Sequence, residues 1–425
     1  MHHAPSHAKA TVARKVDNLD GVLSAIVGGT RASTSRSNSP PPSTSSLSHQ
    51  DAVAPHRASS FNMTIHHLMV GTWTPPGAIF TFAFDDVALT LELVKRTPIP
   101  VDEPISWMTF DHAKKNLYGA ALKAWASFAV ESPTSIVHQA SLPMCHHALS
   151  PDANTRAIFL LASPYPPYGV YCNPFYDYAG AVSVLPVTSS GALAGSAQTV
   201  PLDPHSGVHG AVFHPDGRHL YSADLSANKI WLHRRPDPAS PCLELVAAVD
   251  APDSRDHPRW VAVHPSGSAL YVLMEKGNRV CEFAVGQQDR VPVFTGRHFS
   301  LVPPDSESDP FSSYRGDVCA LSHSATYLFA STRASSLDRP GYLSVFELKP
   351  DSGEMLRRVL IDPTSTSGGH SNAVSPSDWC DDWVAVTEDQ CGFLDVHRWR
   401  HESLERVARI QVPEPGFGMN AIWYD

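Results

Sequence analysis

Two stretches of the chain decide the fold: VHGAVFHPDGRHLYSADL at residues 208–225 and PRWVAVHPSGSALYVLME at residues 258–275. Each contains an alternating apolar segment, a turn of the form His-Pro-x-Gly and a second apolar segment. Alternation with a period of two residues indicates a β-strand with one buried face, and the turn between two such segments predicts a hairpin. The two stretches are therefore copies of one β-hairpin unit.

This unit recurs along most of the chain. Four further copies are ISWMTFDHAKKNLYGAAL (105–122), the divergent TRAIFLLASPYPPYGVYCN (155–173), DVCALSHSATYLFASTRA (317–334) and SNAVSPSDWCDDWVAVTE (371–388). The turn residues of the six copies, His112, Pro164, Pro215, Pro265, His323 and Pro376, stand 52, 51, 50, 58 and 53 residues apart. Two more strand-like segments follow most copies. Four short strands in a period of about 50 residues are typical of a β-propeller blade.

The two ends of the repeat region predict one more blade. The C-terminal FGMNAIWYD (417–425) resembles an opening strand that no second strand follows. The segment HHLMVGTWTPPGAIFTFAF (66–84) resembles a second and a third strand that no opening strand precedes. Pairing these segments completes a blade and leaves no sheet edge open. We therefore expect an all-β fold, a seven-bladed β-propeller over residues 63–425 that is closed by its N- and C-terminal strands.

The first 62 residues differ in composition from the repeats. They are rich in Ser and Pro, with few residues to bury, and this predicts a disordered tail. Residues 1–60 hold six Lys or Arg and three Asp, a basic composition that mitochondrial targeting segments share. We expect a cytoplasmic protein, with mitochondrial targeting by residues 1–60 as the minor alternative.

Charge and cysteine content narrow the classes of partner. The formal net charge of −10 argues against nucleic acid or a membrane surface as a partner. Apolar runs stay well short of a membrane span. The seven cysteines are scattered, with no Cys-x-x-Cys pair and no zinc-type spacing, so we expect a reduced intracellular protein without a structural metal.

The repeat register identifies candidate site residues, because the opening strand of a blade lines the central channel. At the mouths of these strands stand Ser106, His209, Arg259, Asp317, the run His370, Ser371, Asn372, and Asn420. At the ends of the second strands stand Thr72, Trp73, Lys123, Asp224, Glu275, Arg333, Glu388 and Asp389. Packing alone favours small or apolar residues at such positions. The polar residues found instead predict a convergent binding pocket.

Four of these residues form a plausible catalytic set. His209, Arg259, Glu275 and Arg333 supply an imidazole, a carboxyl group and two permanent cations. Such groups can bind a small polycarboxylate and move one proton. Taken singly, the same residues also fit structural roles, such as a core histidine, a channel salt bridge or a solvated turn.

Several long motifs resemble the fungal carboxy-cis,cis-muconate cyclases, a group of seven-bladed propeller lactonases. They are HHLMVGTWTPPGAIFTF, DEPISWMTFDHAKKNLYGAA, YSADLSANKIW, DHPRWVAVHPSG, TSGGHSNAVSP and PEPGFGMNAIWYD. The resemblance implies a cycloisomerase that closes 3-carboxy-cis,cis-muconate to a carboxymuconolactone in the β-ketoadipate pathway of aromatic catabolism. It also implies that no cofactor is needed and that the protein forms a homo-oligomer.

The resemblance assigns roles to the candidate residues. It implies that His209, Arg259, Glu275 and Arg333 are functional residues. We assign His209, Glu275 and Arg333 to catalysis, and Arg259, His370 and Asn372 to substrate binding. We expect Glu275 to donate the proton, because a carboxyl group in an apolar, closed channel can stay protonated, and His209 to bind or orient the substrate. Two alternatives remain open: a propeller lactonase that hydrolyses a sugar lactone such as 6-phosphogluconolactone, and a non-catalytic interaction scaffold.

Overall fold

The computed structural model describes residues 64–144, 155–176, 180–304 and 313–425, and the tail predicted at residues 1–62 lies outside them. These residues form seven four-stranded antiparallel sheets, which we number as blades 1 to 7. Blade 1 contains β28 (Phe417–Trp423), β1 (Ile65–Thr72), β2 (Ala78–Asp85) and β3 (Thr90–Pro98); blade 2 contains β4 (Ile105–Phe110), β5 (Asn116–Ala121), β6 (Ala124–Ser132) and β7 (Ser135–Pro143). Blade 3 contains β8 (Arg156–Ala162), β9 (Gly169–Phe175), β10 (Ala181–Pro186) and β11 (Gln198–Pro201); blade 4 contains β12 (Val208–Phe213), β13 (His219–Asp224), β14 (Lys229–Arg234) and β15 (Glu244–Asp250). Blade 5 contains β16 (Pro258–Val263), β17 (Ala269–Met274), β18 (Arg279–Val285) and β19 (Pro292–Ser300). Blade 6 contains β20 (Tyr314–Leu321), β21 (Tyr327–Ala334), β22 (Tyr342–Leu348) and β23 (Met355–Pro363); blade 7 contains β24 (Val374–Pro376), β25 (Trp383–Glu388), β26 (Phe393–Arg400) and β27 (Ser403–Gln411).

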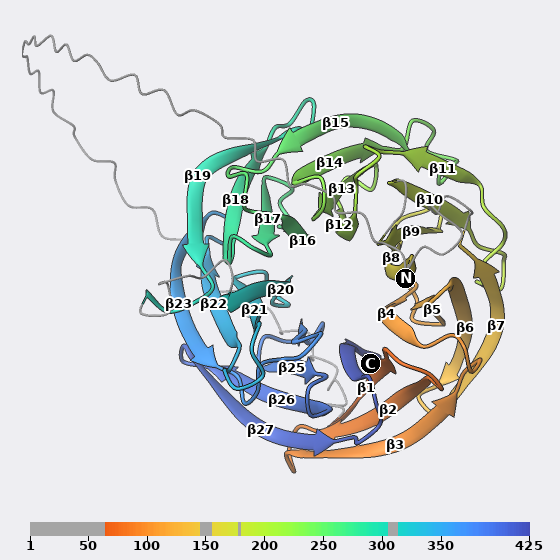
Figure 1. Ribbon diagram of the computed structural model, residues 1–425, viewed down its shortest axis with the longest axis vertical. Coiled ribbons are helices and arrows are strands. Elements are labelled where there is room, and N and C mark those ends of the chain that lie inside the picture. The colour runs from red at the N-terminus through yellow and green to blue at the C-terminus, as the bar shows by residue number, and fades with distance from the viewer. Residues whose placement is uncertain (1–63, 145–154, 177–179, 305–312) are drawn as a thin grey trace, which may run out of the picture. The chain divides into compact units, whose positions relative to one another are not determined.

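The blades follow one another around a central axis, and blade 1 closes the ring (Figure 1). Its innermost strand is β28, from the C-terminal end, which pairs antiparallel with β1. In this pairing Leu68 lies opposite Trp423, and Val70 lies opposite Ala421. The seven-bladed propeller and its closure by strands from both ends of the repeat region are therefore confirmed.

Burial differs from the inside of a blade to its outside. Every side chain of the second strand β17 is buried, whereas in the fourth strand of the same blade, β19, only the first residue is buried and the rest are half-buried or exposed. The tight turns between the first and second strands depend on glycine: Gly217 and Gly267 have φ of +69° and +71°, a region that other residues rarely adopt. The apolar alternation and these turns place the start of each inner strand at the same end of the ring.

Aromatic side chains fill the central space below that end. The indole of Trp107 on β4 packs against the indole of Trp260 on β16, with ring centroids 4.4 Å apart. Phe159 on β8 contacts Trp260 edge-on at 5.2 Å. These rings come from blades 2, 3 and 5, so they link blades across the axis and form an apolar floor. No helix among the described residues has the length and apolarity needed to cross a membrane.

Candidate active site

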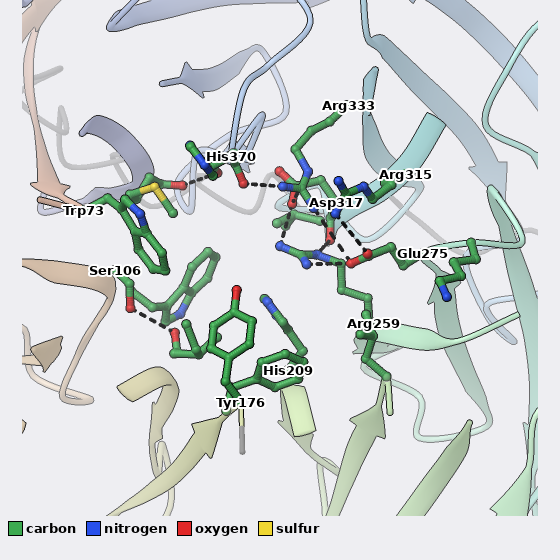
Figure 2. A pocket seen from close by; sticks show the side chains of 18 residues that line it. Trp73, Ser106, Tyr176, His209, Arg259, Glu275, Arg315, Asp317, Arg333 and His370 are labelled. Atoms are coloured by element: carbon green, nitrogen blue, oxygen red, sulfur yellow. Dashed lines mark hydrogen bonds and ion pairs between the residues drawn. The ribbon is translucent and has the colours of Figure 1, made fainter. Parts of the chain in front are cut away.

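A cavity of about 350 Å³ lies at the end of the ring where the inner strands begin (Figure 2). Each of the seven blades contributes at least one lining side chain. Five of the six residues predicted from the sequence line this cavity: His209, Arg259, Glu275, Arg333 and His370. The register of the repeats therefore brings together side chains that stand up to 161 positions apart in the sequence.

Asn372 is the exception, and its predicted direct contact with substrate needs correction. Its side chain is buried outside the cavity lining, and Nδ2 donates a hydrogen bond to the Thr332 carbonyl oxygen at 2.9 Å. Its backbone N–H donates to Oδ2 of Asp317 at 2.6 Å. Asn372 lies in an irregular segment before β24, where strand alternation does not fix the direction of a side chain. It supports the cavity wall from behind by holding Asp317.

A buried ion cluster forms one wall of the cavity. Nη1 of Arg259 lies 2.7 Å from Oε2 of Glu275, and Nη2 lies 2.8 Å from Oδ1 of Asp317. The guanidinium of Arg333 faces the same two carboxylates at 3.8 Å and 3.5 Å. All four side chains are at most 10% exposed. Two cations and two carboxylates thus neutralise one another in a place that water barely reaches.

The pKa values of the two arginines shift in opposite directions in this buried cluster. Burial disfavours the charged form of Arg259, but Asp317 and Glu275 outweigh burial and raise its pKa. Burial lowers the pKa of Arg333, whose guanidinium lies farther from the same carboxylates. Asp317 contacts both arginines, as Glu275 does. In the sequence Asp317 stands at the mouth of an opening strand, but its pattern predicted no role for it.

The surroundings predicted for Glu275 are wrong. An apolar channel was expected to keep this carboxyl group protonated. Instead the guanidinium groups of Arg259, Arg333 and Arg315 lie 2.7, 3.8 and 4.0 Å from its oxygens. Arg259 belongs to the same repeat as Glu275, but Arg315 and Arg333 come from the next blade, so their approach to Glu275 could not be read from that repeat. The carboxyl group therefore lies among guanidinium groups and not in an apolar channel.

His209 lies across the cavity from blade 6, near the start of β12. Its ring meets Phe175 edge-on, with centroids 5.5 Å apart. Its Nδ1 is buried and has no hydrogen-bond partner among the residues that the structure describes. Burial first, and the charge of Arg259 second, hold the pKa of His209 well below its ordinary value. The ring is therefore neutral at neutral pH in the unliganded protein.

The side of the cavity opposite the ion cluster is aromatic and apolar. Trp73, Trp107, Phe175 and Tyr176 line it, together with aliphatic side chains. Figure 2 shows Trp73 and Ser106 facing the cluster of arginines across the open space. The guanidinium of Arg156 lies over the Trp73 ring at 4.4 Å from its centroid. Such a wall can pack against the carbon skeleton of a small ligand.

Arg315 is a charged lining residue that was not predicted from the sequence. Its side chain is 54% exposed and lies at the mouth of the cavity, next to Glu275. A signal was present, because Arg315 stands two positions before Asp317 and alternate residues of a strand share a face. Within the described ranges, no group of three or more His, Cys, Asp or Glu side chains is placed to hold a metal ion.

Comparison with known proteins defines the class first. Residues 67–390 match the family described as lactonase, 7-bladed beta-propeller, so the chain belongs to this family. A putative 6-phosphogluconolactonase from Bacteroides fragilis has a similar structure, with a TM-score of 0.70 over 87% of this chain and 100% of that one at 15% identity. The periplasmic gluconolactonase of Pseudomonas aeruginosa gives a TM-score of 0.69 over 84% and 99% at 19% identity. At these identities the two structures establish the fold alone.

The curated relatives are more specific. Over 369 residues the chain is 56% identical to a carboxy-cis,cis-muconate cyclase from Neurospora crassa. The aligned region covers 85% of this chain and 100% of that relative. Over 201 residues the chain is 28% identical to muconate cycloisomerase 1 from Cutaneotrichosporon cutaneum. This aligned region covers 45% of this chain and 50% of that protein.

Proposed function

We propose that the protein is a carboxy-cis,cis-muconate cyclase, an isomerase that closes 3-carboxy-cis,cis-muconate to a carboxymuconolactone. The 56% identity to the Neurospora crassa cyclase over the whole length of that protein supports this function. The observation that carries it in the structure is the cavity, in which three arginines face an apolar wall. A conjugated polycarboxylate needs both features, cations for its carboxylates and an apolar surface for its carbon chain.

The charge of the cavity suits an anion. Arg259 and Arg333 are balanced by Glu275 and Asp317, as described above. Arg315 and Lys276 also line the cavity and leave it with a surplus of two positive charges. A substrate with three carboxylates brings three negative charges, so it meets an attractive field in spite of the protein's net charge of −10.

The same cations stabilise the reaction. One substrate carboxylate adds to an alkene carbon, and the alkene electrons move onto a second, conjugated carboxyl group as an enolate-like charge. Arg259 and Arg333 are fixed in place by buried carboxylates and need no rearrangement to meet that charge. The α-carbon then takes one proton. Ring closure removes one carboxylate charge, so each turnover consumes one proton from the solution.

The test is an assay of the purified full chain with 3-carboxy-cis,cis-muconate in the presence of a chelator. Cyclisation destroys the conjugated diene, so we expect loss of ultraviolet absorbance and appearance of a lactone by NMR. A parallel assay with 6-phosphogluconolactone tests the lactonase alternative. Hydrolysis of that lactone without any loss of diene absorbance would contradict the proposal.

We also propose that the protein forms a homo-oligomer through the outer strands of its blades. The supporting observation is a set of exposed apolar side chains on β3, β7, β15, β19 and β23: Leu93, Val94, Val137, Leu245, Val246, Val293 and Leu356. These side chains lie on five different blades, and any of them that a contact between two copies covers would be buried favourably. Light scattering after size-exclusion chromatography should give a mass above 46.1 kDa, and a monomer mass would contradict this proposal.

For its location we propose the cytoplasm. The six cysteines of the described residues are all free thiols, which fits a reducing compartment. Imaging of the full chain and of a version that starts at Met63 tests this. Both should be diffuse in the cytoplasm, and mitochondrial signal from the full chain alone would contradict it.

A further inference from the structure

The segment before β24 wraps around one buried carboxylate at the rim of the cavity. The backbone N–H groups of His370 and Ser371 both donate to Oδ1 of Asp389. Nδ1 of the His370 ring lies 2.8 Å from Oδ2 of the same carboxylate. The side chain of Asp389 is 5% exposed, whereas that of His370 is 71% exposed. The carboxylate is therefore fixed inside the protein and holds an imidazole that solvent can reach.

Two glycines make this wrapping possible. Gly368 and Gly369 have φ of +90° and +63°, which L side chains rarely adopt. A Cβ atom on Gly369 would lie 2.1 Å from Oδ1 of Asp389. The backbone therefore approaches the carboxylate as closely as glycine alone allows. This close approach places both N–H groups and the ring of His370 on Asp389.

The same histidine is tied to the ion cluster. Nη1 of Arg333 donates to the carbonyl oxygen of His370 at 2.5 Å. On its other side, the ring stacks with Trp73, with centroids 6.2 Å apart. The charged groups that contact His370 are thus Asp389, from the end of β25, and Arg333, from β21. His370 joins the arginine side of the cavity to the aromatic side, and its Nε2 is the ring nitrogen that Asp389 does not hold.

The proposed reaction requires a proton donor, and the two residues first considered are poorly placed. Glu275 is ion-paired with guanidinium groups from two blades. His209 is half-buried in the cavity wall, and desolvation together with nearby arginines holds its pKa well below the ordinary value. A carboxylate on one ring nitrogen, by contrast, orients an imidazole and stabilises its positive charge. Burial raises the pKa of Asp389, and the His370 imidazole together with the backbone N–H groups of His370 and Ser371 opposes that rise.

We propose that His370 is the catalytic acid of the cyclisation and that Asp389 is its positioning residue, an inference that rests on the proposed function. As the substrate carboxylate forms the new C–O bond, the alkene electrons move toward the second carboxyl group. The α-carbon takes the proton from Nε2 of the His370 imidazolium, and the neutral ring keeps its Nδ1 proton on Asp389. Solvent then returns a proton to Nε2, which its exposure permits, and this is the one proton that each turnover consumes.

The decisive experiment is the pH dependence of kcat for the wild type, His370→Gln, His209→Gln and Asp389→Asn. Wild-type kcat should fall as the pH rises, because the acid form is lost. His370→Gln should lower kcat by about 10²–10⁴-fold, the usual contribution of a general acid, and should lack this high-pH fall. Asp389→Asn should move the fall to lower pH, since the imidazolium loses its carboxylate. A merely structural role would lower kcat without changing the shape of the profile.

Controls separate chemistry from folding. His323→Gln changes an exposed histidine in the turn after β20, and it should behave as the wild type. Thermal unfolding checks that each variant is folded, and added imidazole should restore part of the activity of His370→Ala at the open rim.

The outcomes distinguish this inference from the proposed function. If the wild type is active and His370→Gln keeps both the wild-type kcat and its fall at high pH, the inference about His370 is overturned and the proposed function stands. Loss of the high-pH fall in His209→Gln, with its retention in His370→Gln, also overturns it and assigns the proton to His209. A wild type that leaves 3-carboxy-cis,cis-muconate unchanged overturns both proposals.

Discussion

The cavity has two walls that differ in almost every physical respect. The charged wall, from blades 5 and 6, consists of Arg259, Glu275, Arg315, Asp317 and Arg333. The aromatic wall, from blades 1 to 3, consists of Trp73, Trp107, Phe175 and Tyr176. The charged wall is held by ion pairs and can stabilise negative charge that develops on the substrate. The aromatic wall can only exclude water and pack against the carbon skeleton of the substrate. We therefore expect substitutions in the first wall to affect the rate and those in the second to affect binding.

Arg259→Gln should have the largest effect, because it breaks the charged wall at its centre. The variant removes a cation from the cavity and leaves Glu275 and Asp317 short of a buried partner. We expect kcat/KM to fall by about 10²–10³-fold and the free energy of unfolding to drop by about 3–5 kcal/mol. Kinetics and urea unfolding measure the two effects. Wild-type values for either would show that the wall does not act as a unit.

His233→Leu tests how the stability of the propeller scaffold, away from the two cavity walls, depends on pH. His233 on β14 is fully buried, both ring nitrogens lack a partner among the described residues, and burial lowers its pKa to about 4. The unfolded chain takes up a proton near pH 6.5, so stability present at neutral pH is lost as the pH falls toward 4. Between pH 7 and pH 5 this histidine should cost about 2 kcal/mol. The urea unfolding midpoints at pH 7 and pH 5 should differ less in His233→Leu than in the wild type. An unchanged difference would refute the role of His233 in acid sensitivity.

Arg315→Gln tests the exposed end of the charged wall. Arg315 adds to the positive surplus of the cavity, so its loss should matter most for a substrate with three carboxylates. We expect kcat/KM for 3-carboxy-cis,cis-muconate to fall by about tenfold, roughly 1.4 kcal/mol, with a smaller fall for any turnover of unsubstituted cis,cis-muconate. Arg339→Gln, an exposed arginine outside the cavity lining, is the matched control. Equal losses on both substrates would contradict a role in specificity.

Trp73→Leu should have the smallest effect and should fall mainly on binding. The indole packs at the cavity edge and carries the Arg156 guanidinium on its face. Its loss should raise KM by about 2–10-fold and leave kcat within about twofold, the scale expected for one aromatic contact. Steady-state kinetics measure both parameters. A fall in kcat as large as that of Arg259→Gln would erase the distinction between the two walls.

Sequence reasoning succeeded where a local pattern carried the information. The period-two alternation and the His-Pro-x-Gly turns predicted the blades, and the register of their first strands brought His209 and Arg259 to one end of the ring. Prediction from the sequence failed where residues from other blades determine the surroundings of a side chain. The arginines around Glu275 come from three different strands, and no single repeat contains them.

The segment around Asn372 shows a second limit of such reasoning. There the chain is irregular, so no periodicity indicates which side chains point inward. His370 lines the cavity, while Asn372, two positions later, faces away from it and holds Asp317. The repeat register placed both His370 and Asp389 at this end of the ring, but the hydrogen bond between their side chains depends on the irregular loop and is visible only in the folded structure.

A crystal structure of the protein with the lactone product bound tests the central claim most directly. We expect the ligand inside the seven-bladed ring, with its carboxylates within hydrogen-bonding distance of Arg333 and Arg315 and its lactone ring against Trp73 and Trp107. A ligand bound outside this cavity, or with its carboxylates turned toward the aromatic wall, would contradict it.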